Sequence, residues 1–324
     1  YLDIKDYKNS KKYYAKLLIV NPHNVQAAFD LSYIYLLNRR LIKGFNFYES
    51  RIKFKEFNQL LPNSYPNKIK DLKNKKVFIY CEQGLGDTIH FMRFIKYITK
   101  YTRYIDICIQ DSLYSLMKYN YKDLNFVDST YYIKIKYDYV FSLLSIPYLK
   151  KLESFKPLKK YLIINKKVKK IKSIDNKYIN IGLCWQGEVK NKRDKYRSFD
   201  IDIFLDQLNK YDMGKYKFYS LQKDVRINNI KVIDLGVDFS DFYDTAVAIK
   251  SMDLIITVDT SVCHLSGAMG KKTYLLLPYY PDWRWGDTLE KSDLYKSVKY
   301  FRQIKKDSWI EPFTQIVSKL KEFK

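Results

Sequence analysis

The sequence has little cysteine. Its four cysteines, Cys81, Cys108, Cys184 and Cys263, lie far apart, and no two of them form a Cys-x-x-Cys pair. This spacing excludes the disulfide framework of a small secreted domain and the usual ligand pattern of a structural zinc site. Three of the four fall in or beside apolar runs, where cysteine behaves as a small buried hydrophobe. We therefore expect reduced cysteines and a cytoplasmic protein.

Long hydrophobic runs are also absent. No stretch of about 18 uninterrupted apolar residues occurs, so no membrane span is expected. The chain opens with YLDIKDYKNS, without an initiating methionine or a signal-like apolar segment, which predicts that it begins inside a longer protein. At 324 residues, 47% of them hydrophobic, it is long enough for two domains and apolar enough for a real core.

Acidic residues are scarce relative to basic ones. There are 35 Asp and Glu against 59 Lys and Arg, a formal net charge of +24. Such a balance suits a nucleic-acid partner, whose binding would weaken steeply with salt, but the lysines are scattered along the whole chain. The one local excess, eleven lysines within 150–177, is interpreted as a solvated basic linker. Nucleic acid is therefore not favoured as a partner.

Residues 1–55 show a helical period without strand-like alternation. Ser10 and Gly44 are about 34 residues apart, as are Tyr14 and Tyr48, and this is the period of a tetratricopeptide repeat. The segment resembles the last one and a half repeats of such an array, with an unrelated helical hairpin as the alternative. The positions at which the repeat places its packing residues, and the proline that would end the preceding repeat, are Ala28, Leu31, Ser32, Tyr35, Gly44, Tyr48 and Pro22.

From residue 75 onward, strand-like runs alternate with helical patterns. Strands are expected at 76–81, 104–109 and 137–144, and helices at 88–101 and 112–119. After the lysine-rich stretch the alternation restarts at 178–185 and closes with a strand at 272–278. Alternation of this kind predicts parallel sheets covered by helices.

Two such blocks predict an α/β protein with two Rossmann-like domains that face each other across a cleft. The expected parts are a helical segment at 1–55, an N-terminal domain at 56–160, the lysine-rich linker at 161–177, and a C-terminal domain with a final helix at 178–324. In open parallel sheets, ligands bind beyond the carboxyl ends of the strands. The residues that follow each strand are therefore the candidate site residues.

The first candidate site is CEQGLGDTIHF, residues 81–91, which follows an apolar strand. Gly84 and Gly86 would let the backbone approach a ligand closely. Asp87 opens the next helix and has two interpretations. It is either a helix N-cap, for which aspartate is among the favoured residues, or a general base that is held on a rigid element.

The second candidate site is the strand–turn–helix DLIITVDTSVCHLSG. Asp259 ends the strand, and Thr260 and Ser261 occupy the start of the helix. Free amides and hydroxyls at a helix start, with the helix dipole behind them, suit a diphosphate. His264 lies one turn further on and could donate to a phosphate or contact Asp259.

Two further strand ends carry polar candidates. Arg197 precedes a helix and could bind a phosphate through its guanidinium fork, while Gln222 and Lys223 suit a ribose or phosphate oxygen. Asp200 and Asp202 resemble a metal-binding Asp-x-Asp pair but are interpreted as a helix start, so no metal site and no cofactor are expected. The other basic residues of the loop before Arg197 are interpreted as solvated: Lys190, Lys192, Arg193 and Lys195.

Four stretches, EQGLGDTIHFMRF, GLCWQGEVKNKRDKYRSF, DLIITVDTSVCHLSGAMG and LLLPYYPDWRW, occur in this order. Together they resemble the glycosyltransferase domain found behind tetratricopeptide repeats in bacteria. That group is similar to the heptosyltransferases of glycosyltransferase family 9, which use ADP-heptose. The resemblance covers roughly residues 15–315 and implies the GT-B fold, with a final helix that packs back toward the first domain.

The resemblance also implies roles for individual residues. The aspartate of the Gly-Asp motif, the proposed base, corresponds to Asp87. The element that binds the donor diphosphate corresponds to Asp259, Thr260, Ser261 and His264. Arg197 corresponds to the basic residue of the loop, and Gln222 lies near the ribose position. Heptosyltransferases usually carry glycine where this chain has Ser261, and PYYPDWRW belongs to the repeat-linked branch, so a heptose donor does not follow directly.

The expected function is therefore an inverting, metal-independent glycosyltransferase. It would move a sugar from a nucleotide-diphosphate sugar to a hydroxyl of a protein or glycan acceptor, which the tetratricopeptide-like segment could dock. Two alternatives come from other classes. One is a non-catalytic repeat scaffold with a nucleotide-sensing transferase-like domain, and the other is a nucleotide-sugar epimerase, which would need no acceptor.

Overall fold

The protein forms two compact units. A computed structural model describes residues 5–54, 65–128, 130–131, 135–165, 171, 173–188, 190–191, 193–211, 213–223, 225–227, 229 and 231–323. The first unit contains Tyr1–Lys156 and Asp282–Thr288, and the second contains Pro157–Pro281 and Leu289–Lys324. Part of the lysine-rich stretch, Lys192, and the expected boundary near residue 56 lie outside the described residues.

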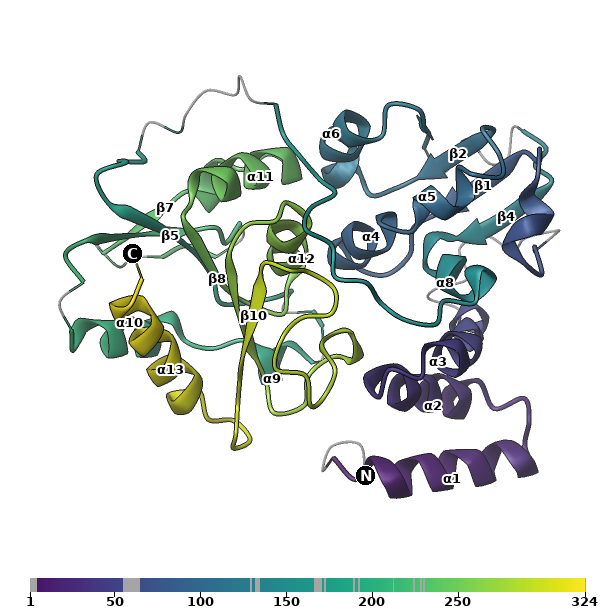
Figure 1. The fold of residues 1–324 in the computed structure, drawn as a ribbon, viewed down its shortest axis with the longest axis horizontal. Helices are drawn as coiled ribbons and strands as arrows, with labels where there is room; N and C mark the ends of the chain where they lie inside the picture. The colour runs from purple at the N-terminus through teal and green to yellow at the C-terminus, as the bar shows by residue number, and fades with distance from the viewer. Residues whose placement is uncertain are drawn as a thin grey trace. The chain divides into compact units, whose positions relative to one another are not determined.

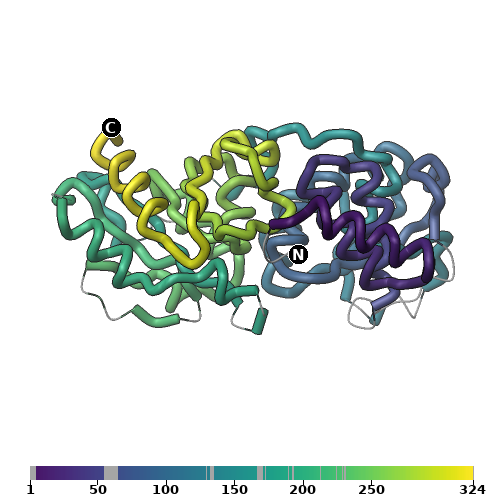
Figure 2. The backbone as a smooth tube through the Cα atoms, turned by 90° about the horizontal axis from the view of Figure 1, so that it is seen from below, coloured from purple at the N-terminus to yellow at the C-terminus, as the bar shows by residue number. Residues whose placement is uncertain are grey.

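Three consecutive helices begin the first unit (Figures 1 and 2). They are α1 (Tyr7–Val20), α2 (Val25–Leu37) and α3 (Leu41–Tyr48), followed by the 3₁₀ turn η2 (Glu49–Lys53). The side chain of Asn24 caps α2 by accepting a hydrogen bond from the amide of Ala27 (2.8 Å). Close packing of α2 on α3 depends on Gly44, because a β-carbon there would lie 2.6 Å from the Leu36 side chain. The resemblance of these helices to tetratricopeptide repeats stays a prediction.

The rest of the first unit is a four-stranded parallel sheet in the order β3-β2-β1-β4. Strand β1 (VFIY) is buried along its whole length, as expected for a central strand covered on both faces. The strands and helices are β1 (Val77–Tyr80), α4 (Leu85–Met92), α5 (Ile95–Ile98), β2 (Ile105–Cys108), α6 (Asp111–Asn120), β3 (Asn125–Phe126), β4 (Tyr139–Ser142) and α8 (Ile146–Lys150), with 3₁₀ turns η3 (Ile69–Leu72) and η4 (Leu143–Ser145).

The helix expected at 88–101 is two helices, α4 and α5. At the break, the amide of Phe94 donates to the carbonyl of Phe91 (2.9 Å), one residue closer than in an α-helix. The carbonyl of His90, which would have accepted that bond, accepts instead from Nε of Arg93 (3.0 Å). The side chain of Arg93 thus replaces a backbone donor, and the helix tightens and ends there.

The second unit is built on a six-stranded parallel sheet in the order β10-β9-β8-β5-β6-β7. Its central strands β5 and β8 are apolar and buried. The elements are β5 (Ile179–Cys184), α9 (Asp194–Arg197), α10 (Ile201–Asn209), β6 (Tyr216–Ser220), β7 (Val232–Asp234), η5 (Gly236–Asp238), α11 (Phe242–Ser251), β8 (Leu254–Val258), α12 (Ser261–Ala268), β9 (Thr273–Leu277), β10 (Val298–Arg302) and α13 (Ile310–Lys321).

The final helix corrects one expectation. Helix α13 lies beside α10 (Figure 1), and its residues Phe313, Ile316 and Leu320 are buried in the core of the second unit. The expectation that it packs toward the first domain is therefore wrong. Its apolar face covers the sheet from which the chain has just emerged, and that sheet gains the edge strand β10, which the sequence did not reveal.

Two smaller expectations concern single features. Asp200 is the N-cap of α10 and accepts from the amide of Asp202 (3.0 Å), as its position in the sequence indicates. Among the described helices, none is long and apolar enough to cross a membrane.

Candidate functional site

Strand order places one candidate site in the first unit. Strands β2 and β3 lie on one side of β1 and β4 lies on the other, so the order reverses between β1 and β4. Ligands of open α/β sheets bind at such switch points, beyond the carboxyl ends of the strands. The two strand ends are joined here, because the hydroxyl of Ser142 donates to Glu82 Oε1 (2.7 Å).

The turn that follows β1 is rigid. Gln83 adopts a left-handed conformation with φ of 63°, which is costly for a residue other than glycine. Two neighbours stabilise it: Gln110 Nε2 donates to the Gln83 carbonyl (3.3 Å), and the Tyr48 hydroxyl accepts from Gln83 Nε2 (2.9 Å). Gly84 itself has an ordinary φ of −85°. A β-carbon there would meet only Asp87 Oδ2, at 3.4 Å, so packing within the protein does not require glycine at this position.

Asp87 lies in the first turn of α4, but it is not the N-cap. Gly84 holds the N-cap position, and Asp87 Oδ2 accepts from the Gly84 amide three residues back (3.1 Å). The other oxygen, Oδ1, forms an ion pair with Arg284. The N-cap interpretation is therefore corrected in position, although Asp87 does stabilise the start of the helix.

Arg284 is the positive charge beside Asp87. It comes from the 3₁₀ turn η6 (Trp283–Trp285), which belongs to the first unit, and its side chain is 9% exposed. A second carboxylate, Asp282, accepts from Arg284 Nη1 (2.7 Å). Burial raises the pKa of Asp87, the positive charge of Arg284 opposes that rise, and Asp282 adds to it. Asp87 remains 18% exposed, so a partly desolvated carboxylate reaches the surface.

A second ion pair lies behind this turn. Arg51, which is fully buried, donates through Nε to Glu82 Oε1 (2.6 Å) and through Nη2 to the hydroxyl of Ser145 (2.8 Å). It therefore connects the N-terminal helical segment to the ends of β1 and β4. Removing one partner of such a buried pair is strongly destabilising, so we assign this cluster to the fold.

Strand order places the other candidate site in the second unit, between β5 and β8. Strands β6 and β7 lie on one side of β5, and β8, β9 and β10 lie on the other. Thr260 follows β8 and is the N-cap of α12. Its hydroxyl lies 3.2 Å from the Thr257 hydroxyl and 3.6 Å from Sγ of Cys184, the last residue of β5. Ser261 then begins α12, where the first amides have no partner within the helix.

Arg197 joins the long loop after β5 to the end of β8. Its Nε donates to Asp194 Oδ1 (2.9 Å), and its Nη1 donates to the carbonyl of Asp259 (2.7 Å). This arrangement depends on Gly187, because a β-carbon there would lie 2.2 Å from Asp194 Oδ1 and 2.5 Å from Arg197 Nη2. A guanidinium is thus brought to the start of α12 by residues from three segments.

The remaining candidates in the second unit have protein partners. The side-chain nitrogen Nε2 of Gln222 donates to the Gln186 carbonyl (3.0 Å), and its side-chain oxygen Oε1 lies 3.4 Å from Cys184 Sγ. Lys223 is exposed, and its ammonium donates to the carbonyl of Ser240 (3.1 Å). Gln222 therefore supports the loop after β5, and Lys223 points along the surface.

His264 lies one turn into α12 and is 4% exposed. Its Nδ1 is 2.8 Å from the hydroxyl of Tyr295, which is fully buried. The structure thus brings together, at the ends of β5 and β8, Asp259, Thr260, Arg197 and Gln222. His264 lies one turn further along α12 and contacts Tyr295.

Sequence reasoning missed three residues of these sites, namely Arg284, Tyr295 and Asp194. Each acts on a residue that was identified. Arg284 is 197 positions from Asp87 and Tyr295 is 31 positions from His264, so no local pattern connects them. Two local signals were available: the tripeptide Trp-Arg-Trp within PYYPDWRW for Arg284, and the spacing of three residues between Asp194 and Arg197.

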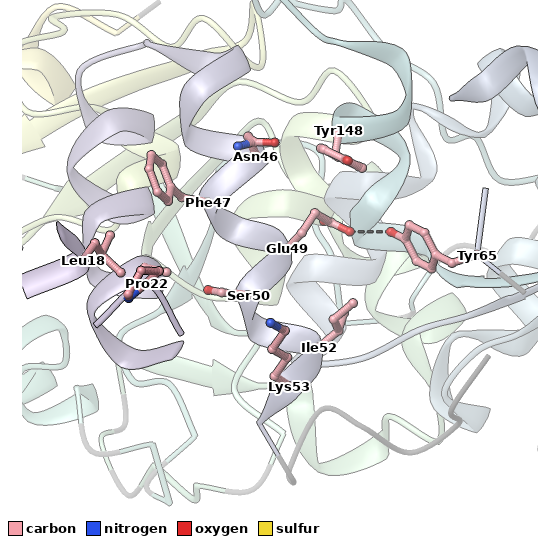
Figure 3. A pocket seen from close by; sticks show the side chains of 11 residues that line it. Leu18, Pro22, Asn46, Phe47, Glu49, Ser50, Ile52, Lys53, Tyr65 and Tyr148 are labelled. Atoms are coloured by element: carbon pink, nitrogen blue, oxygen red, sulfur yellow. Dashed lines mark hydrogen bonds between the residues drawn. The ribbon is translucent and has the colours of Figure 1, made fainter. Parts of the chain in front are cut away.

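Figure 3 shows a pocket of about 520 Å³ elsewhere in the first unit. Side chains from α1 to η2 line it, with Tyr65 and Tyr148 on the opposite side, and the Tyr65 hydroxyl donates to Glu49. None of the candidate site residues lines this pocket. Within the described ranges, no group of three or more His, Cys, Asp or Glu side chains is placed to hold a metal ion.

Comparisons with known proteins bear on the fold. No protein-family model and no curated protein sequence matches this chain. A crystal structure of the iron-containing dodecameric glycosyltransferase TibC from enterotoxigenic E. coli H10407 matches 73% of this chain and 64% of its own, with 11% identity and a TM-score of 0.51. The E. coli ADP-heptose LPS heptosyltransferase II matches 76% of this chain and 98% of its own, with 10% identity and a TM-score of 0.51. The chain shares the fold of these transferases.

At these identities the likeness is one of fold. A mixed α/β architecture with two parallel sheets is consistent with the GT-B-like heptosyltransferases that the four sequence motifs resemble. This chain spans less than two thirds of TibC, 58% and 64% of it in two crystal structures. The link to tetratricopeptide repeats and the roles of the individual site residues stay predictions.

Proposed function

We propose that the protein is a glycosyltransferase. It transfers a sugar from a nucleotide-diphosphate sugar to a hydroxyl group of a protein or glycan acceptor, with inversion at the anomeric carbon. One observation carries the proposal: each unit has a polar cluster at the switch point of its own parallel sheet. The cluster of the first unit is built on a carboxylate, Asp87, and that of the second on a helix start with a nearby guanidinium, from Arg197.

The second unit would bind the donor. Free amides at the start of α12, next to Thr260 and Ser261, suit the diphosphate, and the helix dipole favours its negative charge. Arg197 is already anchored at that helix start, so it would stabilise the charge that develops on the leaving diphosphate. His264 would orient this helix through Tyr295. The name of one structural neighbour, an ADP-heptose transferase, makes ADP the first nucleotide to test.

Asp87 would act as the general base. The acceptor oxygen forms a bond to the anomeric carbon while the bond from that carbon to the diphosphate oxygen breaks, and the proton of the hydroxyl passes to Asp87. Burial raises the pKa of Asp87, which strengthens it as a proton acceptor, while Arg284 favours the ionised form that the role requires. Because the Asp87 carboxylate accepts a hydrogen bond from the Gly84 amide, it is oriented before the acceptor binds.

Replacing Asp87 by Asn tests the base. The amide oxygen can still accept from Gly84, so we expect the helix start to persist, donor affinity to stay near wild type, and turnover to fall about 10²- to 10⁴-fold. The matched control is Asp282→Asn, because Asp282 is the other carboxylate on Arg284 and acts on Asp87 only through its charge. Turnover and the free energy of unfolding are measured for both variants.

If both variants lose turnover in proportion to stability, Asp87 is structural and the catalytic assignment fails. A second candidate is a scaffold that binds a nucleotide without transferring sugar, and a wild-type protein without turnover would favour it. The specific observation in its favour is that both oxygens of Asp87 already have protein partners. A scaffold of this kind would bind the nucleotide with wild-type affinity in every variant and would show no turnover with any acceptor.

A further inference from the structure

Arg284 is held in place by two tryptophans. Trp283 and Trp285 are 3% and 0% exposed. The ring of Trp283 packs against the rings of Phe45 and Tyr48 from α3, with a centroid distance of 5.9 Å in each case. The turn η6 ends at Gly286, whose φ of 61° favours glycine. Burial of the flanking rings therefore fixes the backbone from which Arg284 extends.

The N-terminal helices bind this turn directly through Arg39, which lies between α2 and α3. Its Nη1 donates to the carbonyl of Trp283 (2.7 Å) and its Nη2 to the carbonyl of Arg284 (2.9 Å). A second connection is an ion pair between Lys5 and Asp287 (3.0 Å), the residue that follows Gly286. Residues more than 240 positions apart are thus joined within one compact unit.

The geometry of Arg39 is specific. Its planar fork satisfies two successive carbonyls at once, which a lysine ammonium cannot do in the same way. The residue also has a left-handed backbone, with φ of 58°, and this conformation is uncommon for a side chain other than glycine, asparagine or aspartate. This conformation ends α2 as a helix cap, because the amide of Arg40 donates to the carbonyl of Tyr35 (2.8 Å).

We propose that the N-terminal helices complete the candidate catalytic site, with Arg39 as a positioning residue that fixes η6 and thereby holds Arg284 on Asp87. This inference rests on the proposed function of Asp87 as the base. It gives the helical segment a role besides docking an acceptor, because the orientation of the base depends on it. The chain of contacts runs from Arg39 through the carbonyls of Trp283 and Arg284 to the Arg284 guanidinium, and from there to Asp87.

The groups that act on Asp87 come from two elements besides its own. Arg284 and Asp282 approach from η6, and the hydroxyl of Tyr48 approaches from α3. Burial raises the pKa of Tyr48 to about 12, so this tyrosine stays neutral and only the η6 charges vary with the position of the turn. Displacement of η6 moves the positive charge of Arg284 away, and the pKa of Asp87 then rises.

The test compares Arg39→Ala, Arg39→Lys and the control Arg40→Ala in the full chain. Arg40 is the exposed neighbour of Arg39 in the same turn, so its replacement removes the same charge without touching η6. The carboxyl carbon of Asp87 is followed by NMR titration of protein labelled with ¹³C-aspartate, and the Asp87→Asn variant assigns the signal. Transfer kinetics against pH are measured in parallel with the donor and acceptor that the wild-type protein accepts.

We expect Arg39→Ala to raise the pKa of Asp87 and to lower kcat about 10- to 100-fold while the donor KM changes little. Arg39→Lys should recover part of both effects, and Arg40→Ala should match wild type. If Arg39→Ala does not fold, the same shifts, smaller in size, are measured in Arg39→Lys.

Two results separate this inference from the proposed function. An unchanged Asp87 titration and unchanged kcat in both Arg39 variants, in a protein that transfers sugar, would overturn the inference and leave the function standing. If the Arg39 variants shift the titration of Asp87 but the wild-type protein transfers no sugar to any acceptor, the positioning by Arg39 is supported and the proposed function is overturned.

Discussion

At the scale of single residues, Asp87 combines a structural role with the proposed role of base. One oxygen stabilises the start of α4 through Gly84, and the other faces Arg284. A carboxylate with only the first role would need no buried guanidinium beside it. The pairing with Arg284 instead favours the ionised form of a desolvated carboxylate, which a general base requires.

Replacing Arg284 by Gln should therefore shift the pH dependence of transfer. Arg284 opposes the rise that burial causes in the pKa of Asp87, so without it the pKa should rise further. The base must be ionised, so activity is lost as the pH falls through this pKa, and the acid limb of the kcat profile should move to higher pH. Arg284→Lys, which retains the charge, should move it less.

The free energy of unfolding should depend on pH in the opposite direction to activity. Because the folded-state pKa of Asp87 is raised, its contribution to stability is present below the ordinary pKa of an aspartate and is lost as the pH rises through the raised value. Arg284→Gln raises that value further, so the loss should be larger in this variant. Urea unfolding at several pH values measures it, and a variant that becomes more stable with rising pH across this range would contradict the ion-pair account.

At the scale of elements, the short helix α9 connects the loop after β5 to the end of β8. Arg197 in α9 donates to Asp194 in the same helix and to the carbonyl of Asp259. Gly187 leaves the space in which this guanidinium lies. The loop conformation and the candidate phosphate contact thus depend on the same small residue.

Gly187→Ala should displace Arg197. Overpacking of this kind costs about 1–3 kcal/mol, and we expect weaker nucleotide binding together with a lower free energy of unfolding. Gly84→Ala is the matched control, since a β-carbon at Gly84 meets only an ordinary contact at 3.4 Å, and its stability should stay near wild type. Calorimetric titration with ADP and urea unfolding measure both variants, and wild-type binding in Gly187→Ala would exclude Arg197 from the nucleotide site.

At the scale of the whole molecule, the two units provide different chemistry on similar sheets. The first unit presents a carboxylate and the second a helix start with a guanidinium, each at a switch point. A nucleotide should therefore bind to the second unit alone. The effect of nucleotide binding on the free energy of unfolding can be measured without knowledge of the acceptor.

We expect a cognate nucleotide at about 100 times its dissociation constant to add roughly 2.7 kcal/mol to the free energy of unfolding. ADP, UDP, GDP and CMP, each with and without common sugars, form the panel, and hydrogen exchange then locates the protected amides. Protection should appear at 184–187 and 259–264. Protection confined to the first unit would contradict the assignment of the donor site, and no stabilisation by any nucleotide would contradict nucleotide binding by this chain.

The sequence by itself determined the local structure and the positions of the candidate residues. Continuous apolar runs predicted buried parallel strands, because both faces of such strands are covered, and most of the central strands lie where these runs occur. Asp87, Thr260 and Ser261 could be found because each lies at or near the start of the helix that follows a strand. Local order of this kind is encoded within about ten residues and can be read from them.

Only the tertiary structure decided which residues act on these candidates. Arg284 reaches Asp87, Tyr295 reaches His264, and Arg39 binds the turn at 283–285 across large separations in the chain. Such contacts arise from the packing of distant segments and leave no periodicity in the sequence. The final helix shows the same limit: its apolar face indicated burial, but only the assembled sheet of the second unit determined where that face would pack.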